Sequence, residues 1–215
     1  MSGTVETLSR VIASPPDRPQ VGGADHPMRK VTRQIAFEPN GWDGERRAKV
    51  AELFDGLAPD WDSRAQSSET RTPLVDALAR GGELLGPCVE LGAGTGRATR
   101  PLLDHFGSVL AADIAIEMLR RFQEPVAMAV RADSASLPLR DASVGTLVLV
   151  NAFLFPSEVE RVVAPGGAVV WVNTLAEDTP IHLPVADVVN ALPGAWHAVT
   201  AAAGWGLWAV VRRAT

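Results

Sequence analysis

The stretch CVELGAGTGR at residues 88–97 decides the fold. An apolar run, Cys88–Leu91, leads directly into a turn that has glycine at every second position, and a helix-compatible stretch follows Gly96. Glycine allows a sharp turn and a close ligand approach because it has no Cβ atom. In an open α/β sheet, ligands bind at the carboxyl ends of the strands. Residues 88–97 therefore predict a strand, a ligand-binding turn and a helix.

Predicted strands and helices alternate along the chain on either side of this turn. Further strands are expected at 109–112, 126–131, 146–150 and 168–172, and helices at 43–57, 72–81, 97–105, 116–122 and 158–163. This alternation is typical of a parallel sheet with helices on both faces.

The C-terminal segment departs from the alternation. Two strand-like runs, 196–202 and 207–212, are joined by only four residues, 203–206. So short a link cannot make a parallel crossover, so these strands should pair antiparallel. The predicted fold is an α/β, Rossmann-like three-layer sandwich with a seven-stranded, mostly parallel sheet and an antiparallel C-terminal hairpin.

Three parts of the chain differ in character. Residues 1–40 carry prolines and a Gly-Gly pair among polar residues, so we expect a flexible N-terminal arm. Residues 41–83 hold the first two predicted helices, joined by a loop at 58–62, and are expected to form a helical cap. Residues 84–215 are expected to form the ligand-binding domain.

Composition limits the classes of partner. The chain has 215 residues, a formal net charge of −5 and a sequence pI near 5.4, which does not favour nucleic acid. There is one cysteine, Cys88, no metal-ligand spacing is apparent, and no apolar run reaches membrane-spanning length. We therefore expect a cytoplasmic protein, a monomer or homodimer, that uses no metal and binds neither nucleic acid nor membrane.

An acidic residue stands at the end of the second predicted strand of the domain. Asp113 follows Gly92 by 21 residues (113 − 92), where a carboxylate can accept hydrogen bonds from both ribose hydroxyls of an adenosine ligand. The alternative is that Asp113 only caps the helix that begins near Ile114.

These segments together resemble the class I S-adenosylmethionine-dependent methyltransferases. Residues 90–97 match the family's acidic-x-Gly-x-Gly-x-Gly signature, whereas the third glycine of the dinucleotide motif Gly-x-Gly-x-x-Gly is Arg97 here. Residues 131–139, 148–153 and 163–169 resemble the family's third-strand, fourth-strand and "L-x-P-G-G" segments, in the right order. The resemblance covers about residues 50–213 and implies S-adenosyl-L-methionine as the cofactor.

The resemblance also implies a set of cofactor-binding residues. Glu90 would help to hold the methionine amino group, Asp133 and the Ser134 amide would face the adenine, and Trp61 would lie beside the cofactor. Glu90 could instead be an exposed acid at a strand end, and Trp61 could be a packing residue. The whole implied set is Trp61, Glu90, Gly92, Ala93, Gly94, Gly96, Asp113, Ile114, Asp133, Ser134 and Asn151.

Candidates for catalysis are few. Asn151 could orient an acceptor or merely cap a strand, and His182 could be an acceptor-side base or an exposed loop histidine. The helix at 46–57, the loop around Trp61 and the apolar residues 153–156 should close the acceptor site, which favours a small, partly apolar acceptor. Two alternatives remain open: a non-catalytic cofactor-binding protein of the same fold, and an NAD(P)-dependent oxidoreductase.

Overall fold

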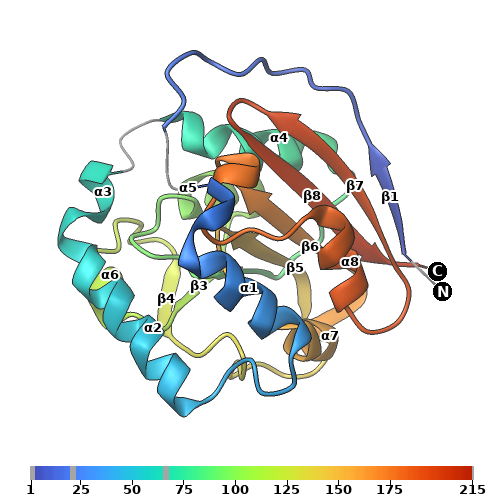
Figure 1. The fold of residues 1–215 in the computed structure, drawn as a ribbon. Helices are drawn as coiled ribbons and strands as arrows, with labels where there is room; N and C mark the ends of the chain where they lie inside the picture. The colour runs from blue at the N-terminus through green and yellow to red at the C-terminus, as the bar shows by residue number, and fades with distance from the viewer. Residues whose placement is uncertain (1–2, 20–22, 65–67, 215) are drawn as a thin grey trace.

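The computed structural model describes residues 3–19, 23–64 and 68–214, and its centre is one eight-stranded sheet (Figure 1). The strand order is β1-β7-β8-β6-β5-β2-β3-β4, and β8 alone runs antiparallel to its neighbours. The strands are β1 (Thr4–Thr7), β2 (Cys88–Leu91), β3 (Val109–Asp113), β4 (Met128–Arg131), β5 (Val144–Val150), β6 (Val163–Asn173), β7 (Trp196–Ala203) and β8 (Gly206–Arg213). The predicted Rossmann-like sandwich and its antiparallel hairpin are confirmed, with β1 as an additional strand.

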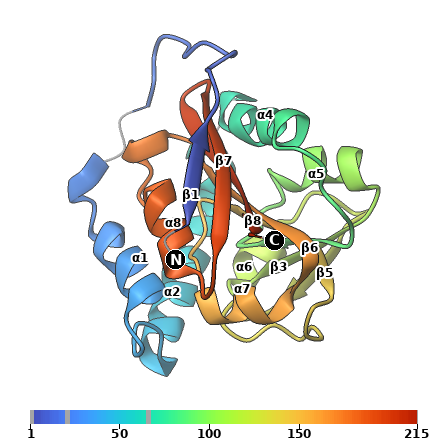
Figure 2. The same ribbon diagram turned by 90° about the vertical axis from the view of Figure 1, so that its right-hand side faces the viewer.

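Helices cover both faces of the sheet, as the edge view in Figure 2 shows. One buried cluster joins α4 and α5 to the sheet through Leu74, Ala77 and Leu102, and the other joins α7 and α8 through Val159 and Val188. The α-helices are α1 (Pro27–Phe37), α2 (Gly44–Leu57), α3 (Trp61–Arg64), α4 (Thr72–Arg80), α5 (Thr99–Phe106), α6 (Ile116–Leu119), α7 (Pro156–Val162) and α8 (Val185–Ala191). Short 3-10 helices are η1 (Gly23–Asp25), η2 (Ala58–Asp60), η3 (Ser68–Arg71) and η4 (Ala176–Asp178).

Strand β2 is buried along its whole length, and its side chains alternate between the two clusters. Val89 and Leu91 belong to the cluster with α7 and α8, whereas Cys88 belongs to the cluster with α4 and α5. Burying such an aliphatic side chain contributes about 1.5–3 kcal/mol. Since Glu90 shares the face of Cys88, its carboxyl group is directed towards α5 rather than towards solvent.

The N-terminal segment holds regular structure that the sequence interpretation missed. Residues 4–7 form β1, which pairs in parallel with β7 although its four side chains are all exposed. Helix α1 starts at Pro27, where the His26 side chain accepts the Met28 N–H, and buries Ile35. The prediction of residues 1–40 as an arm without strands or helices is therefore wrong. Strand β1 depends on a backbone edge about 190 residues away, which no local pattern reveals.

Smaller differences concern element boundaries. The segment 58–62, predicted as a loop, is the 3-10 helix η2 followed by the first turn of α3. The helix predicted at 116–122 ends at Leu119, and α8 was not predicted. Among the described residues, no helix is both long enough and apolar enough to cross a membrane.

The strand order places a crevice beside β2. From β2 the chain continues to β3 and β4 on one side, and then returns to β5 on the other side. At such a switch point the loops after two neighbouring parallel strands diverge and leave room for a ligand. The loops that begin at Gly92 and Asn151 stand at this position.

Candidate functional site

The crevice opens into a cavity of about 550 Å³ between the strand ends and the N-terminal helices. Ten of the eleven residues predicted to bind the cofactor line it: Trp61, Glu90, Gly92, Ala93, Gly94, Asp113, Ile114, Asp133, Ser134 and Asn151. Gly96 does not line it. A Cβ atom at Gly96 would lie 3.0 Å from the Phe122 ring, so this glycine makes room for a side chain of the protein.

The glycine turn requires glycine for two separate reasons. Gly92 and Gly94 have φ angles of +66° and +57°, in the left-handed region that favours glycine. A Cβ atom at Gly92 would also lie 3.0 Å from the Cβ atom of Ala152, and one at Gly94 would lie 3.7 Å from Trp61 Nε1. The turn is therefore enclosed by the loop after β5 on one side and by α3 on the other.

Three amides of this turn are already bonded within the protein. The Ala93 N–H donates to the Ala112 carbonyl (3.1 Å), the Gly94 N–H to Asp113 Oδ2 (2.8 Å), and the Gly96 N–H to the Ala93 carbonyl (2.9 Å). Dinucleotide-binding turns use free amides at this point to hold a pyrophosphate. These three N–H groups are therefore not free to bind a phosphate, and the turn is poorly suited to one.

Asp113 joins the glycine turn to the start of α6. Its Oδ2 atom accepts from Gly94 and its Oδ1 atom accepts from the Ala115 N–H, both at 2.8 Å. Burial raises the pKa of this carboxyl group, and the backbone hydrogen bonds oppose that shift. Each carboxylate oxygen can accept a second hydrogen bond, and Asp113 lines the cavity. The helix that Asp113 was predicted to cap begins at Ile116, with Ala115 as its N-cap and no side-chain cap. Asp113 instead accepts the N–H of Ala115 and faces the cavity.

Glu90 is the most buried acid of the site, with 1% of its surface exposed. The Thr99 hydroxyl donates to Glu90 Oε2 at 2.5 Å. Burial raises the pKa of Glu90 to about 8, while the Thr99 hydrogen bond lowers it and the nearby Asp113 charge raises it further. The alternative of an exposed strand-end acid is wrong. A buried carboxyl group that faces a cavity is suited to a cationic group of a ligand.

Asp133 is bound by a residue that the sequence interpretation missed. The Trp42 indole N–H donates to both carboxylate oxygens, at 3.1 and 3.2 Å, and the Ala135 N–H donates to Oδ1 at 2.9 Å. Arg47 lies 3.7 Å from Oδ2. Trp42 lies just before α2 and is 91 residues from Asp133, and nothing local in the sequence marks this contact.

Aromatic side chains form the opposite wall of the cavity. The Trp42 ring packs edge-on against Phe155 (5.2 Å between centroids) and tilted against Phe153 (6.1 Å). Trp61 packs edge-on against Phe54 (5.9 Å) and stands over Gly94. Trp61 therefore packs against residues of α2, as one predicted alternative has it. It also lines the cavity, where the other alternative places the cofactor.

Asn151 lines the cavity, but both the Nδ2 and the Oδ1 atom of its side-chain amide already form hydrogen bonds within the protein. Its Nδ2 atom donates to the Thr174 hydroxyl (2.8 Å), and its Oδ1 atom accepts the Thr174 N–H (3.0 Å). Its φ angle of +51° lies in the left-handed region. These bonds tie the end of β5 to the end of β6, so Asn151 first of all holds the two strand ends together.

His182 does not reach the cavity lining. Only 4% of its surface is exposed, and its Nδ1 atom lies 2.8 Å from Asn173 Oδ1. Burial lowers the pKa of His182 to about 4, and the nearby positive charge of Arg29 lowers it further. The structure contradicts both predicted alternatives for this histidine, the acceptor-side base and the exposed loop residue.

His26 is a cavity-lining histidine that the sequence interpretation did not propose. Its Nδ1 atom accepts the Met28 N–H at 3.2 Å, so in the neutral ring the proton lies on Nε2. The sequence does hold a local signal for His26 as an N-cap, because it precedes a proline that starts a helix. Among the described residues, no group of three His, Cys, Asp or Glu side chains could hold a metal ion.

Comparison with known proteins identifies methyltransferases as relatives. A family model described as "Methyltransferase domain" matches residues 89–171. A phosphatidylethanolamine N-methyltransferase from Cereibacter sphaeroides is 34% identical over 144 residues, which cover 60% of this chain and 67% of that protein. A demethylmenaquinone methyltransferase from Paenarthrobacter aurescens (strain TC1) is 28% identical over 180 residues, which cover 71% of this chain and 70% of that protein.

A solved structure agrees with these relatives at the level of the fold. The DhpI–SAH complex aligns with a TM-score of 0.61 and 20% identity, over 76% of this chain and 94% of that chain.

Proposed function

This chain belongs to the class I S-adenosylmethionine-dependent methyltransferases, and from that premise we propose that it methylates a small, partly apolar acceptor. The observation that carries the proposal is the contrast between the two walls of one cavity. Acidic side chains and the glycine turn form one wall, and aromatic and aliphatic side chains form the other. The first wall suits a cationic adenosine cofactor, and the second suits an apolar acceptor.

The acidic wall fits S-adenosylmethionine better than a dinucleotide. The carboxyl groups of Glu90, Asp113 and Asp133 line the cavity, where they suit the ammonium and sulfonium groups of this cofactor better than the anionic oxygens of a pyrophosphate. The bonded amides of the turn add to that mismatch. Both features argue against the alternative of an NAD(P)-dependent oxidoreductase. When bound, S-adenosylmethionine supplies a methyl group on a sulfonium centre that is already activated for transfer.

We assign a separate part of the cofactor to each acid. Glu90 would hold the ammonium group, because a buried carboxylate is stabilised by a nearby cation. The free acceptor capacity of Asp113 would bind ribose hydroxyls. Asp133 and Ser134 would border the adenine, with Trp42 fixing the Asp133 carboxylate in place.

The aromatic wall would hold the acceptor against the transferred group. Trp42, Phe153, Phe155 and Ile181 offer apolar surface, whereas His26 and Thr174 are among the few polar side chains near them. Correct placement of two reactants can by itself lower a barrier by roughly 7–11 kcal/mol. Orienting the acceptor and excluding water would therefore be a main contribution of the protein to the reaction.

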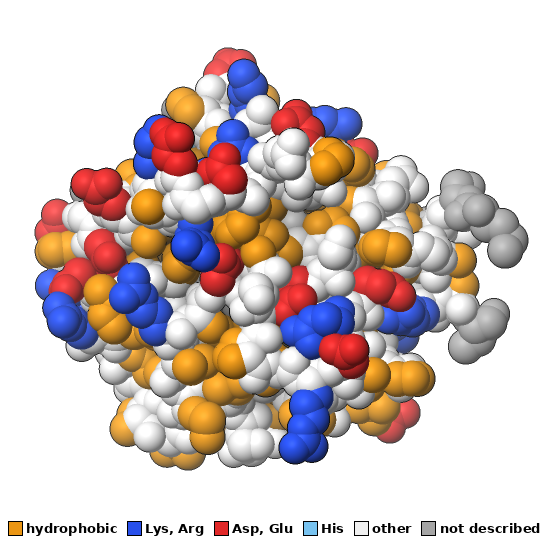
Figure 3. All heavy atoms as spheres, turned by 90° about the horizontal axis from the view of Figure 1, so that it is seen from below, with side chains coloured by type: hydrophobic (Ala, Val, Ile, Leu, Met, Phe, Trp, Pro, Cys, Tyr) orange, Lys and Arg blue, Asp and Glu red, His pale blue; other side chains and the backbone are white. Residues whose placement is uncertain are grey.

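Two further observations favour a small acceptor over a macromolecule. The two curated relatives are named for a quinone-type and a lipid acceptor, demethylmenaquinone and phosphatidylethanolamine. On the face seen in Figure 3, Lys and Arg side chains are interspersed with Asp and Glu side chains and with apolar patches. A continuous basic tract, as a nucleic-acid substrate would favour, is not seen on that face.

The proposal is tested by following a labelled methyl group. The protein is incubated with S-adenosylmethionine carrying a tritiated methyl group and with the fractions of a cell extract separately: small molecules, protein and nucleic acid. Label should appear in organic-soluble small molecules and should require folded protein, with heat-denatured protein as the control. Label that enters only the protein or nucleic-acid fraction would contradict the proposed acceptor class.

A further inference from the structure

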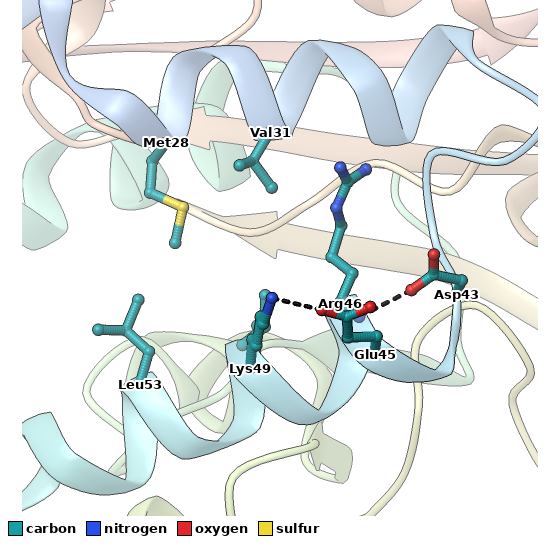
Figure 4. Close-up of a pocket in the computed structure, with 8 residues that line it drawn as sticks. Met28, Val31, Asp43, Glu45, Arg46, Lys49 and Leu53 are labelled. Carbon is teal, nitrogen blue, oxygen red and sulfur yellow. Dashed lines mark hydrogen bonds and ion pairs between the residues drawn. The ribbon is translucent and has the colours of Figure 1, made fainter.

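A second cavity of about 400 Å³ lies between helices α1 and α2, next to the cofactor crevice (Figure 4). Its apolar lining comes from both helices: Met28 and Val31 belong to α1, and Val50 and Leu53 belong to α2. The other lining residues are charged: Asp43, Glu45, Arg46 and Lys49. Figure 4 shows Met28 and Val31 directed from α1 towards α2, and Leu53 directed from α2 towards α1. We refer to this cavity as the α1–α2 groove.

The groove adjoins the main cavity. Met28, Val50 and Leu53 line both spaces, whereas Val31 lines the groove alone. Leu53 stands at the junction and is 45% exposed, which is high for a leucine beside a core. A molecule held against the aromatic wall would therefore meet the side chains of Met28, Val50 and Leu53 on the way to the groove.

The charged residues that line the groove already have hydrogen-bond partners within the protein, and Figure 4 shows the Arg46 side chain extending from α2 towards α1. Lys49 pairs with Glu45 at 2.5 Å, and the Arg46 guanidinium donates to Gln34 Oε1 (3.1 Å) and to the Gly41 carbonyl. Asp43 accepts the Arg46 N–H at 2.8 Å as the N-cap of α2. The polar groups of these side chains are thus bonded within the protein, and the four apolar side chains provide the surface that favours a hydrocarbon occupant.

We propose that the α1–α2 groove binds a hydrocarbon chain of the methyl acceptor while the acceptor's reactive end lies in the main cavity. This inference rests on the proposed function, because it takes the main cavity as the acceptor site. An apolar cavity of about 150 Å³ holds benzene, so a groove of about 400 Å³ has room for a chain well beyond one ring in size. The acceptor class is thus an amphipathic molecule with an apolar tail.

The test uses straight-chain 1-alkanols as probes, because they carry a hydrocarbon chain and no charge. Calorimetric titrations with 1-hexanol, 1-octanol and 1-decanol should give affinities that rise about fourfold for each methylene group that is buried. An affinity that does not change from 1-hexanol to 1-decanol would overturn the inference.

Substitutions locate the chain in the groove. Leu53→Glu places a charge at the junction and should weaken 1-decanol binding at least tenfold. Val31→Trp fills the groove from α1 without adding charge and should weaken 1-decanol binding to a similar extent. Because Val31 does not line the main cavity, this loss would locate the chain in the groove. The matched control is Val75→Glu on α4, a residue that is 49% exposed and lines neither space, which should leave the affinity within twofold. Equal losses in the groove variants and the control would contradict the assignment.

Titration of the wild-type protein with S-adenosylhomocysteine separates the two proposals. If that ligand binds and none of the alkanols does, the groove inference fails while the proposed function stands. If the alkanols bind and S-adenosylhomocysteine does not, the proposed function fails, and the groove inference falls with it.

Discussion

The two walls of the main cavity are specified in different ways by the sequence. The cofactor wall, formed by Glu90, Gly92–Gly94, Asp113 and Asp133, consists of residues at the ends of consecutive strands, and each follows a recognisable apolar run. The opposite wall, called the cap wall below, consists of the aromatic wall together with residues of α1 and α2. Its position depends on contacts such as that between Trp42 and Asp133, which are 91 residues apart. Changes in the cofactor wall should therefore affect binding strongly, and changes in the cap wall should mainly affect stability and acceptor choice.

The largest expected effect comes from the glycine turn. Gly92→Ala adds a Cβ atom 3.0 Å from Ala152 at a φ of +66°, so the turn must shift, and S-adenosylhomocysteine affinity should fall about 100-fold. Gly107→Ala is the matched control, because Gly107 has a φ of +74° with no atom within 4 Å of its Cβ position. It should cost about 1 kcal/mol of stability and leave the affinity unchanged, as calorimetry and urea denaturation can measure. Equal binding losses in both variants would contradict a specific role for the turn.

The next largest expected effect is a pH dependence of S-adenosylhomocysteine affinity that originates in Glu90. Burial raises the pKa of Glu90 to about 8, so the group gains its negative charge as the pH rises towards that value. If the carboxylate holds the cofactor's ammonium group, affinity for S-adenosylhomocysteine should rise from pH 6 to pH 8 by up to about tenfold per unit. Glu90→Gln should bind more weakly and without this slope in the same calorimetric series. A wild-type affinity that is flat over this range would remove Glu90 from the ammonium site.

The same group should make the ligand-free protein less stable as the pH rises. Between pH 4.5 and about 8 the folded state holds a proton on Glu90 that the unfolded state has lost. The free energy of unfolding should therefore fall with rising pH in that window, by up to about 1.4 kcal/mol per unit from this group. Urea denaturation of wild type and of Glu90→Gln at several pH values isolates the contribution, which should be missing in the variant.

Cap-wall substitutions should have the smallest effects. Trp42→Phe keeps an aromatic ring beside Phe153 and Phe155 but removes the N–H that donates to Asp133, and should lower the free energy of unfolding by about 1–2 kcal/mol. Arg47→Gln removes only a half-exposed charge 3.7 Å from the same carboxylate and should cost at most about 0.5 kcal/mol. Urea denaturation ranks the two, and a larger loss for Arg47→Gln would show that the ion pair, and not the indole, anchors the cap.

The difference between the two walls also explains which parts of the structure the sequence could predict. Strand β2, the glycine turn and Asp113 were predicted because apolar runs and glycine spacing are local signals. Strand β1 and Trp42 were missed because each is defined by a partner far along the chain. The hydrogen bonds of the Ala93 and Gly94 amides were also missed, since their partners Ala112 and Asp113 lie on the neighbouring strand.

His182 and Gly96 show that a local signal can be present and still be misread. His182 stands between Ile181 and Leu183, both buried, and those apolar neighbours already favour a buried ring over an exposed loop. Gly96 fits the family's signature, yet its missing Cβ atom makes room for Phe122. A motif therefore fixes which residue type is needed at a position, while the structure decides whether a ligand or another side chain uses the space.

The most direct test of the account is calorimetric titration of the wild-type protein and of Asp113→Asn with S-adenosylhomocysteine and with NAD. Both Asp113 oxygens accept backbone N–H groups, so an asparagine amide would turn a donor towards one of them and disturb the cofactor wall. We predict binding of S-adenosylhomocysteine and none of NAD, with a loss of about 10- to 100-fold in Asp113→Asn. Binding of NAD to the wild type, or equal S-adenosylhomocysteine affinity in the two proteins, would contradict the assignment of the cofactor wall.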